Sequence, residues 1–363
     1  MNLFRSFGIL FLLVFTCAIG CGGGSLKNIT FSRSDSEGLW KLVGCGNEYR
    51  NPYCSSGSLI MSDSGDVTGG DLINFGVDKR RFINGALEIS DKGFVNGTIY
   101  SYLADTDRVE EHVMLDGQMT FDKNMVVYAG IAPITFRGIG ILLKERGGFS
   151  PSDLEGIWIF PLVEQGIFSV SAGSTGNILD CSFTNVKGDN GTCEGVFSIS
   201  REGSVSGNIK SLTGKRFTIE FSGQMNANKG SMIFAGAIST RFEGAATLGI
   251  KKGGNFSSST MQGRWRIFRA SHKKILHGEV TLDRSGALIR GRWNEVEGGS
   301  GTFSQGSFSV SQEGSISGSL TTATNLTYTV YDGQMALVSD IATALDKDNS
   351  GNLGVVILVR IHD

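Results

Sequence analysis

Short runs of alternating hydrophobic and polar residues, separated by glycine-containing turns, extend from residue 37 to the end of the chain. Successive side chains of a β-strand point to opposite faces, so a period of two predicts strands with one buried face. No long stretch repeats its apolar residues with the period of a helix. The pattern therefore predicts an all-β protein.

One hairpin pattern occurs three times without a gap, at residues 85–97, 195–207 and 306–318. Each copy has two alternating runs around a polar turn with glycine, which is typical of a β-hairpin. A glycine closes each copy on its inward face, where it indicates a bend or a close backbone approach. The repetition predicts a tandem array of similar units. The closing glycines are Gly97, Gly207 and Gly318.

Two further motifs recur in register with this hairpin. A Gly-x-Trp motif opens the first strand of each unit, at intervals of roughly 110 residues, the size of a small domain. A Gly-Gln-Met motif precedes the last two strands of each unit. The runs add up to about eight antiparallel strands per unit with short connections. The tryptophans are Trp40, Trp158 and Trp265, and the glutamines are Gln118, Gln224 and Gln334.

These periods divide the chain into five parts. Three tandem meander barrels are predicted, and a pair of packed sheets per unit is the alternative. The segment before them is rich in glycine and small polar residues without periodicity, which predicts a flexible tether. The predicted parts are a signal peptide at 1–20, the tether at 21–36, and barrel repeats at 37–149, 150–258 and 259–363.

The N-terminus has the organisation of an export signal. Arg5 is followed by an apolar segment, 8–15, that is too short to cross a bilayer as a helix. The sequence Ala-Ile-Gly before Cys21 resembles the lipobox of bacterial lipoproteins. That resemblance implies cleavage before Cys21 and a diacylglycerol thioether with an acylated amine, which together anchor a protein stably. Gly22 resembles outer-membrane sorting in diderm bacteria, and an ordinary secretory signal is the alternative.

The Gly-x-Trp motif in the first strand of an eight-stranded meander resembles the lipocalin/calycin superfamily. In that superfamily the strand-one tryptophan packs across the closed end of the barrel, and a basic residue near the last strand covers it. The candidates here are Arg146, Lys251 or Lys252, and Arg360. The Thr-Asp-x-x-Tyr loop and the C-terminal helix of lipocalins are missing. The resemblance therefore implies the fold more strongly than it implies a ligand.

Four cysteines remain in the chain after the predicted signal peptide and Cys21. They fall into two local pairs, and an even number of closely spaced cysteines in an exported protein indicates disulfides. A metal site is the alternative, but no Cys-x-x-Cys spacing or neighbouring histidine supports it. The predicted bridges are Cys45–Cys54 and Cys181–Cys193.

Few residues suggest chemistry. The three recurrent glutamines could line ligand cavities, but a residue kept in every unit more often serves the architecture. Trp293 is flanked by Arg292 and Asn294, and Arg290 lies three positions before it. Trp293 could contact a glycan or an anionic polymer, and the alternative is a packed strand residue. The segment with Asp346, Asp348 and Ser350 has the spacing of half a calcium loop, but position twelve is not acidic. We therefore expect a polar turn there, and no metal or other cofactor.

Composition and charge exclude several classes of function. The chain has 52 Gly, 4 Pro and a formal net charge of −2, so we expect no global basic surface of the kind that nucleic acid requires. Catalytic motifs with a nucleophile elbow, a phosphate loop or a zinc-binding helix are absent from the sequence. We therefore expect a protein that is not an enzyme.

Two functional hypotheses remain. The first is a lipid-anchored binding protein of the cell envelope, which takes a small apolar ligand in its barrels or a surface protein or glycan on its loops. The second is a structural spacer or adhesin-like array, in which the barrels are filled by their own side chains. Eight strands make a barrel that can be filled or can hold one small ligand, so the pattern fits both.

The lipobox interpretation makes a direct prediction. We expect Cys21→Ser to release the protein from membranes, because the variant lacks the thiol that carries the lipid. Fractionation of cells and a mass measurement of the mature N-terminus would check this. Retention of the variant in the membrane fraction would contradict the lipobox interpretation.

Overall fold

A computed structural model describes residues 29–362, apart from 49–50, 75–78, 104–105, 132–135, 163–165, 186–187, 215, 239–242 and 272. The predicted signal peptide and Cys21 lie outside the described residues. Within them, no helix is long and apolar enough to cross a membrane.

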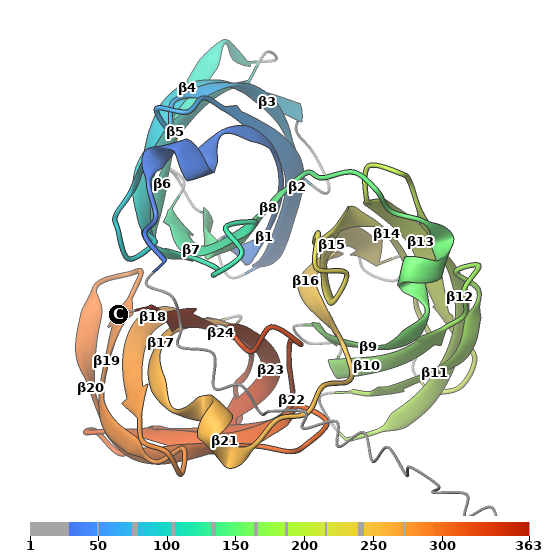
Figure 1. Ribbon diagram of the computed structural model, residues 1–363, viewed down its shortest axis with the longest axis vertical. Helices are drawn as coiled ribbons and strands as arrows, with labels where there is room; N and C mark the ends of the chain where they lie inside the picture. Colours follow the sequence, from blue (N-terminus) through green and yellow to red (C-terminus); the bar gives the residue numbers. More distant parts are fainter. Residues whose placement is uncertain are drawn as a thin grey trace, which may run out of the picture.

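Three closed antiparallel barrels of eight strands each form the molecule (Figure 1). Consecutive strands pair along the chain, and the last strand of each barrel pairs with its first. The all-β prediction and the barrel prediction are therefore confirmed, and the alternative of two packed sheets is wrong. Closure pairs the first strand with the last, which reduces the length of exposed sheet edge.

The strands of each barrel follow one another directly in the sequence. Barrel 1 contains β1 (Gly38–Glu48), β2 (Asn51–Met61), β3 (Val67–Asn74), β4 (Lys79–Ile89), β5 (Phe94–Leu103), β6 (Arg108–Met119), β7 (Met125–Ile131) and β8 (Phe136–Lys144). Barrel 2 contains β9 (Gly156–Leu162), β10 (Gly166–Ala172), β11 (Ile178–Thr184), β12 (Asn190–Ile199), β13 (Ser204–Ser211), β14 (Thr218–Met225), β15 (Ser231–Ile238) and β16 (Glu243–Lys251). Barrel 3 contains β17 (Gly263–Ser271), β18 (Ile275–Leu282), β19 (Leu288–Glu295), β20 (Gly299–Val310), β21 (Ser315–Thr322), β22 (Thr327–Met335), β23 (Ile341–Asp348) and β24 (Leu353–Ile361). Short 3₁₀-helices precede the barrels: η1 (Arg33–Ser36), η3 (Pro151–Leu154) and η4 (Ser258–Met261).

A buried tryptophan closes one end of each barrel, as the lipocalin resemblance implies. Trp40 is fully buried, and its indole N–H donates to the carbonyl oxygen of Ser36 in the preceding 3₁₀-helix. Trp158 and Trp265 make the same bond in their barrels. A cation covers each ring from the last strand, since a positive charge is attracted to the face of an indole. The cations are Lys144, Lys251 and Arg360, so the expectation of Arg146 in the first unit is wrong.

A phenylalanine before each 3₁₀-helix locks the turn of the repeated hairpin. The ring of Phe31 lies against Gly93, and the backbone N–H of Phe31 donates to the carbonyl oxygen of Asp91. Gly93 has a φ of +75° and no space for a side chain, so glycine is required there. Phe149 and Phe256 pack in the same way in barrels 2 and 3.

These phenylalanines change the predicted limits of the units. Phe31 is 3% exposed, and residues 33–36 form η1, so the described end of the predicted tether belongs to barrel 1. Phe149 and Phe256 lie just before the predicted starts of repeats 2 and 3 and pack into the cores of those barrels. The sequence carries a signal for this, because Phe-Ser occurs at the same spacing before each Trp.

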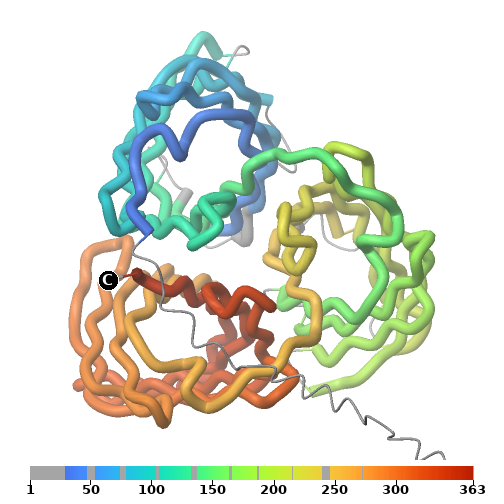
Figure 2. The backbone as a smooth tube through the Cα atoms, in the orientation of Figure 1, coloured from blue at the N-terminus to red at the C-terminus, as the bar shows by residue number. Residues whose placement is uncertain are grey.

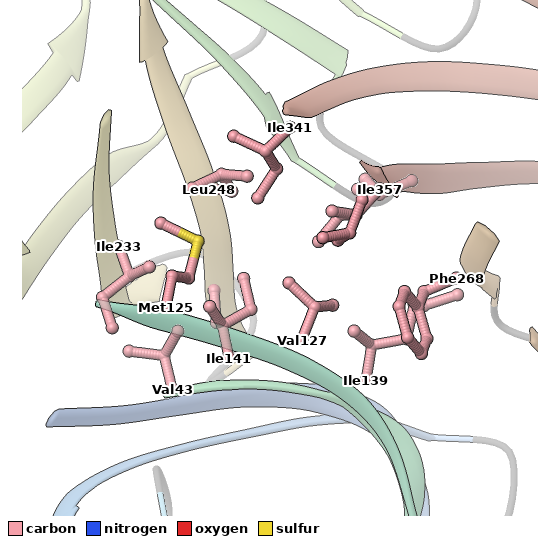
Figure 3. Close-up of a cluster of buried hydrophobic side chains, with 14 of the residues drawn as sticks. Val43, Met125, Val127, Ile139, Ile141, Ile233, Leu248, Phe268, Ile341 and Ile357 are labelled. Atoms are coloured by element: carbon pink, nitrogen blue, oxygen red, sulfur yellow. The ribbon is translucent and has the colours of Figure 1, made fainter. Parts of the chain in front are cut away.

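The three barrels surround a common apolar centre (Figure 2). The last two strands of each barrel face this centre with their outer side chains and the barrel interior with their inner side chains. Val127 and Ile141 of barrel 1 meet Leu248 of barrel 2 and Ile341 and Ile357 of barrel 3 (Figure 3). Each fully buried side chain of this kind contributes about 1.5–3 kcal/mol. We call this cluster the apolar junction.

The barrels are also joined by polar contacts between their tight turns, in addition to the apolar junction. Asp122, in the turn between β6 and β7, accepts hydrogen bonds from the side-chain amides of Asn226 and Asn228 in barrel 2. Asp340, in the matching turn of barrel 3, accepts one from the backbone N–H of Phe121 at 2.9 Å. Asp340 is only 2% exposed. Burial, together with the negative charge of Asp122, raises the pKa of Asp340 to about 7.

Asp340 therefore makes stability depend on pH. Its carboxyl binds a proton more tightly in the folded chain than in the unfolded chain, so stability falls as pH rises from about 4 through about 7. Asp340→Asn keeps an acceptor for Phe121 and cannot ionise. At pH 8 we expect the variant to have a higher Tm and a free energy of unfolding that is larger by on the order of a few kcal/mol. At pH 4 we expect its Tm to be close to that of the original protein.

Thermal unfolding of both proteins between pH 4 and pH 8 would measure the difference. Asp63→Asn, at an exposed turn of barrel 1, is the matched control. A difference in Tm that stays constant across this range would contradict the assignment to Asp340.

Candidate functional site

Phenylalanine rings fill barrel 2. The rings of Phe168, Phe183 and Phe217 pack against one another with centroids 5.5, 5.5 and 5.0 Å apart. Four more rings continue this stack toward the closed end. A barrel of this size that is packed with side chains has no room for a ligand. The four rings belong to Phe160, Phe197, Phe221 and Phe234.

Barrel 3 has a small void where barrel 2 has part of this stack. Gly278 of β18 occupies the register position of Phe168, because each pairs with the residue two positions after its barrel's tryptophan. The void has a volume of about 30 Å³. Sites for drug-sized ligands have volumes of roughly 300–1,000 Å³, and a water needs roughly 10–15 Å³. The void in barrel 3 is therefore too small for an apolar ligand of lipid size.

A buried ion pair lines this void. Nε of Arg269 donates to Oδ2 of Asp346 at 2.6 Å, and the two side chains are 4% and 1% exposed. The guanidinium of Arg269 also lies over the ring of Tyr328, 4.7 Å from its centroid. Burial raises the pKa of Asp346, although Arg269 opposes this shift. Barrels 1 and 2 have Gly130 and Gly236 at the register position of Asp346, so the ion pair is specific to barrel 3.

The ion pair also bears on the segment that has the spacing of half a calcium loop. Asp346 is engaged by Arg269, while Oδ1 of Asp348 accepts hydrogen bonds from the backbone N–H groups of Ser350 and Asn352. The segment is thus a polar turn between β23 and β24. Within the described residues, no group of three or more His, Cys, Asp or Glu side chains is placed to hold a metal ion.

The recurrent glutamines lie at the closed ends of the barrels. The side-chain amide of Gln118 donates to the backbone carbonyls of Lys92, in the turn of the repeated hairpin, and of Met119. Gln224 and Gln334 make the matching bonds in the other barrels. This geometry supports an architectural role for the glutamines and gives no support to a ligand-lining role.

The two disulfides and Trp293 lie in different parts of the structure. Cys45–Cys54 joins β1 to β2, and Cys54 is buried at the apolar junction. Cys181–Cys193 joins β11 to β12 inside barrel 2. Each bridge thus stays within one barrel. Trp293 packs against the core of barrel 3, so its ring is a packed strand residue and its flanking arginines face outward.

Those outward arginines form a grid on the outer face of barrel 3. Two cross-strand rows run over β17, β18 and β19. The first is Arg264, Thr281 and Arg290, and the second is Arg266, Glu279 and Arg292. We call these the Thr281 row and the Glu279 row. They lie along a groove of about 350 Å³, whose lining is Arg264, Glu279, Thr281, Arg290, Gly291 and Arg292.

Glu279 is the centre of the second row. Oε1 of Glu279 accepts from Nε and Nη2 of Arg264 at 3.0 and 2.9 Å, and its Oε2 lies 3.6 Å from Nη2 of Arg292. Arg290 donates instead to the hydroxyl of Thr281 at 3.3 Å. Arg264 and Arg292 thus share Glu279, and the lining of the groove contains three arginines and one glutamate.

Burial and like charge act on the fourth arginine. Arg266 is covered by Phe94 of barrel 1, whose ring centroid lies 4.8 Å from the guanidinium. Burial lowers the pKa of Arg266, and the positive charges of Arg292 and Arg264 lower it further. Asp116 of barrel 1 opposes this shift and lies 2.8 Å from Nδ1 of His277. The grid is therefore packed against barrel 1 at this edge.

The arginine grid occurs on barrel 3 alone among the three barrels. The residues that correspond to the Thr281 row are Leu39, Ile60 and Gly69 in barrel 1 and Ile157, Ser171 and Asp180 in barrel 2. Alternating arginines are visible in the sequence at 264–266 and 290–292, but the sequence does not show that they lie side by side. That step needs the strand register, because only the register places residues 264 and 290 on either side of Thr281.

Comparisons with known proteins were made for the whole chain. No family model matches it, and no curated protein matches it. A solved structure of transferrin binding protein B from Haemophilus parasuis is similar at 9% identity and a TM-score of 0.28, over 89% of this chain and 75% of that one. The same protein from Neisseria meningitidis gives 8% identity and a TM-score of 0.29, over 90% and 77%. Kievitone hydratase from Nectria haematococca gives 9% and 0.21, over 93% and 95%. Likeness at these levels carries no argument about function.

The buried ion pair of barrel 3 leads to a stability prediction. Asp346→Ala leaves the charge of Arg269 buried without its partner, so we expect a loss of about 3–5 kcal/mol in the free energy of unfolding. The double variant Arg269→Met and Asp346→Leu removes both charges and should recover most of that loss. Urea unfolding of the single and double variants would measure both values.

Lys274→Met is the matched control, because it removes one side of an exposed ion pair with Glu295. We expect it to cost less than about 1 kcal/mol. A double variant no more stable than Asp346→Ala would contradict this account.

Proposed function

We propose that the protein is a lipid-anchored, non-enzymatic binding module of the cell envelope, which holds an anionic partner in the groove of the arginine grid. The observation that carries this proposal is the pair of arginine rows, which concentrate positive charge along a groove of ligand size on one barrel. The proposed location is the outer membrane of a diderm bacterium, through an acylated Cys21.

The barrel interiors support a surface site over an internal one. Barrel 2 is filled with aromatic rings, and the void of barrel 3 has a volume of only about 30 Å³. A small apolar ligand inside barrel 2 or barrel 3 is therefore poorly supported. An anionic surface partner, by contrast, would meet guanidinium groups that are already positioned by Glu279 and Thr281.

A structural spacer is the second candidate, and the apolar junction favours it. Three barrels packed on a shared apolar core suit the rigid array that a spacer requires. The spacer hypothesis does not explain why charge gathers on one barrel. Binding measurements separate the two candidates.

The binding test uses the folded chain from residue 22 onward without its lipid. We expect it to co-sediment with envelope fragments at low salt and to dissociate at high salt, because salt screens exposed charges. The triple variant Arg264→Gln, Arg290→Gln and Arg292→Gln should lose at least about tenfold in affinity, since bonds to charged groups contribute about 1.5–3 kcal/mol each.

Arg201→Gln is the matched control, because Arg201 is an exposed turn residue of barrel 2. Its affinity should equal that of the original chain. If the triple variant binds as well as the control, the groove is not the binding site and the spacer interpretation is preferred.

A further inference from the structure

We infer that the closed ends of the three barrels form the face that contacts the membrane, with Leu337 and Val338 as apolar side chains that enter the headgroup region of the bilayer. The inference rests on the proposed function, because it takes the lipid on Cys21 as the link to the bilayer. It adds the surface that meets the lipid and the orientation of the molecule above it.

The closed ends of all three barrels lie on one side of the molecule. The turn between the sixth and seventh strands lies at the closed end of each barrel, and these three turns contact one another. Asp122 of barrel 1 accepts a hydrogen bond from Asn226 of barrel 2, and the backbone N–H of Phe121 donates to Asp340 of barrel 3. Figure 1 shows the three barrels side by side, each viewed along its axis. We call the surface that their closed ends share the closed face.

The described part of the chain begins on the closed face. The ring of Phe31 lies 6.3 Å from the ring of His362, which in turn lies 4.5 Å from the ring of Phe121. Cys21 and Ile29 are eight residues apart. A chain extends at most about 3.6 Å per residue, so this stretch spans at most about 29 Å. A lipid on Cys21 therefore holds the closed face near the bilayer.

The turn of barrel 3 differs in polarity from the two turns that match it. Each turn has five residues between the flanking strands, and the middle residue is Asp122 in barrel 1, Asn228 in barrel 2 and Val338 in barrel 3. Turns favour Asp and Asn, because these side chains bond to the nearby backbone. Leu337 and Val338 are instead large and apolar, and they are 47% and 44% exposed. Barrel 3 thus presents two adjacent apolar side chains on the closed face.

This apolar turn lies beside the point where the described chain begins. Asp340, two residues after Val338, accepts the 2.9 Å bond from Phe121, and Phe121 is linked through His362 to Phe31. The anchor and the apolar turn therefore reach the same bilayer together. Two half-exposed side chains bind a membrane weakly by themselves, but an anchor keeps them at a high effective concentration beside it.

The contact is expected to be apolar rather than electrostatic. Lys229 and Lys252, near this turn, are held in ion pairs within the protein, at 2.9 Å from Asp153 and 2.7 Å from Glu313. Salt screens exposed charges, whereas the burial of apolar surface does not require a charged partner. We therefore expect neutral phosphatidylcholine to suffice and high salt to leave the contact in place, in contrast to binding at the arginine grid.

The test couples the folded chain from residue 21 onward to a lipid with a maleimide headgroup in phosphatidylcholine vesicles. Cys21 offers the thiol for this coupling, because the other four cysteines of this chain form disulfides. Val338→Trp adds an emitter on the closed face, and lipids with brominated acyl chains quench tryptophan on contact. We expect brominated vesicles to reduce the added emission of Val338→Trp. The chain without this substitution gives the emission of the four native tryptophans.

Leu212→Trp is the matched control, because Leu212 is an apolar residue, 57% exposed, in the loop after β13 at the open end of barrel 2. Its emission should be the same in brominated and ordinary vesicles. In the Val338→Trp chain, Leu337→Ser should weaken the quenching, because one of the two apolar groups is lost. Asp63→Ser, at an exposed turn on the closed face of barrel 1, should leave it unchanged. Circular dichroism of each variant checks that the barrels are folded.

The outcomes distinguish this inference from the proposed function. Absence of quenching at position 338, or equal quenching at positions 338 and 212, would overturn the inference. Loss of the quenching at high salt would also overturn it, because the contact would then be electrostatic. The lipid is coupled chemically, so the result is independent of whether the cell acylates Cys21. The variants Cys21→Ser and the triple arginine variant test the proposed function separately.

Discussion

Burial of the last two strands of each barrel on both faces is the constraint on which the molecule depends. A strand in a half-exposed sheet alternates apolar and polar residues, whereas one that is covered on both sides is apolar throughout. In β24, for example, Val356 and Leu358 face the interior of barrel 3 while Ile357 and Val359 face the apolar junction. A single barrel in water would expose this second face as a continuous apolar patch. Each barrel is thus stabilised by its contacts with the other two and is not an independent domain.

The closed end of each barrel provides the second constraint. A tryptophan, a phenylalanine and a glutamine from separate segments converge on the turn of the repeated hairpin. In barrel 1 the ring of Phe31 and the side-chain amide of Gln118 both lie against Gly93, and Trp40 is bonded to the 3₁₀-helix beside them. The arrangement explains why three motifs recur in register along the chain. Each motif supplies one of the residues that pack together at the closed end of the barrel.

The sequence predicts what depends on local pattern. Alternation identifies the strands, and the Gly-x-Trp and Gly-Gln-Met motifs identify the closed end, because each is a contact between neighbouring parts of one barrel. The apolar runs at 138–143 and 353–359 also carry a signal, since an unbroken run indicates burial on both faces. That signal does not say which barrel covers which. The contact between Asp116 and His277, or the covering of Arg266 by Phe94, depends on how two barrels dock and has no local trace.

Like these contacts between barrels, the arginine grid cannot be recognised from local pattern alone. Its place on one barrel has a consequence for valency. Three identical barrels around an axis would form a symmetric trimer, in which every surface feature occurs three times. Here the barrels are joined in one chain, so barrel 3 can differ from its neighbours at the Thr281 row while the shared contacts of the apolar junction are retained. In the part of the chain that the structure describes, the arginine grid thus occurs once per molecule. Strong attachment to a repetitive polymer would have to come from many such chains side by side in one membrane, because the effective concentration of grooves is then set by their surface density.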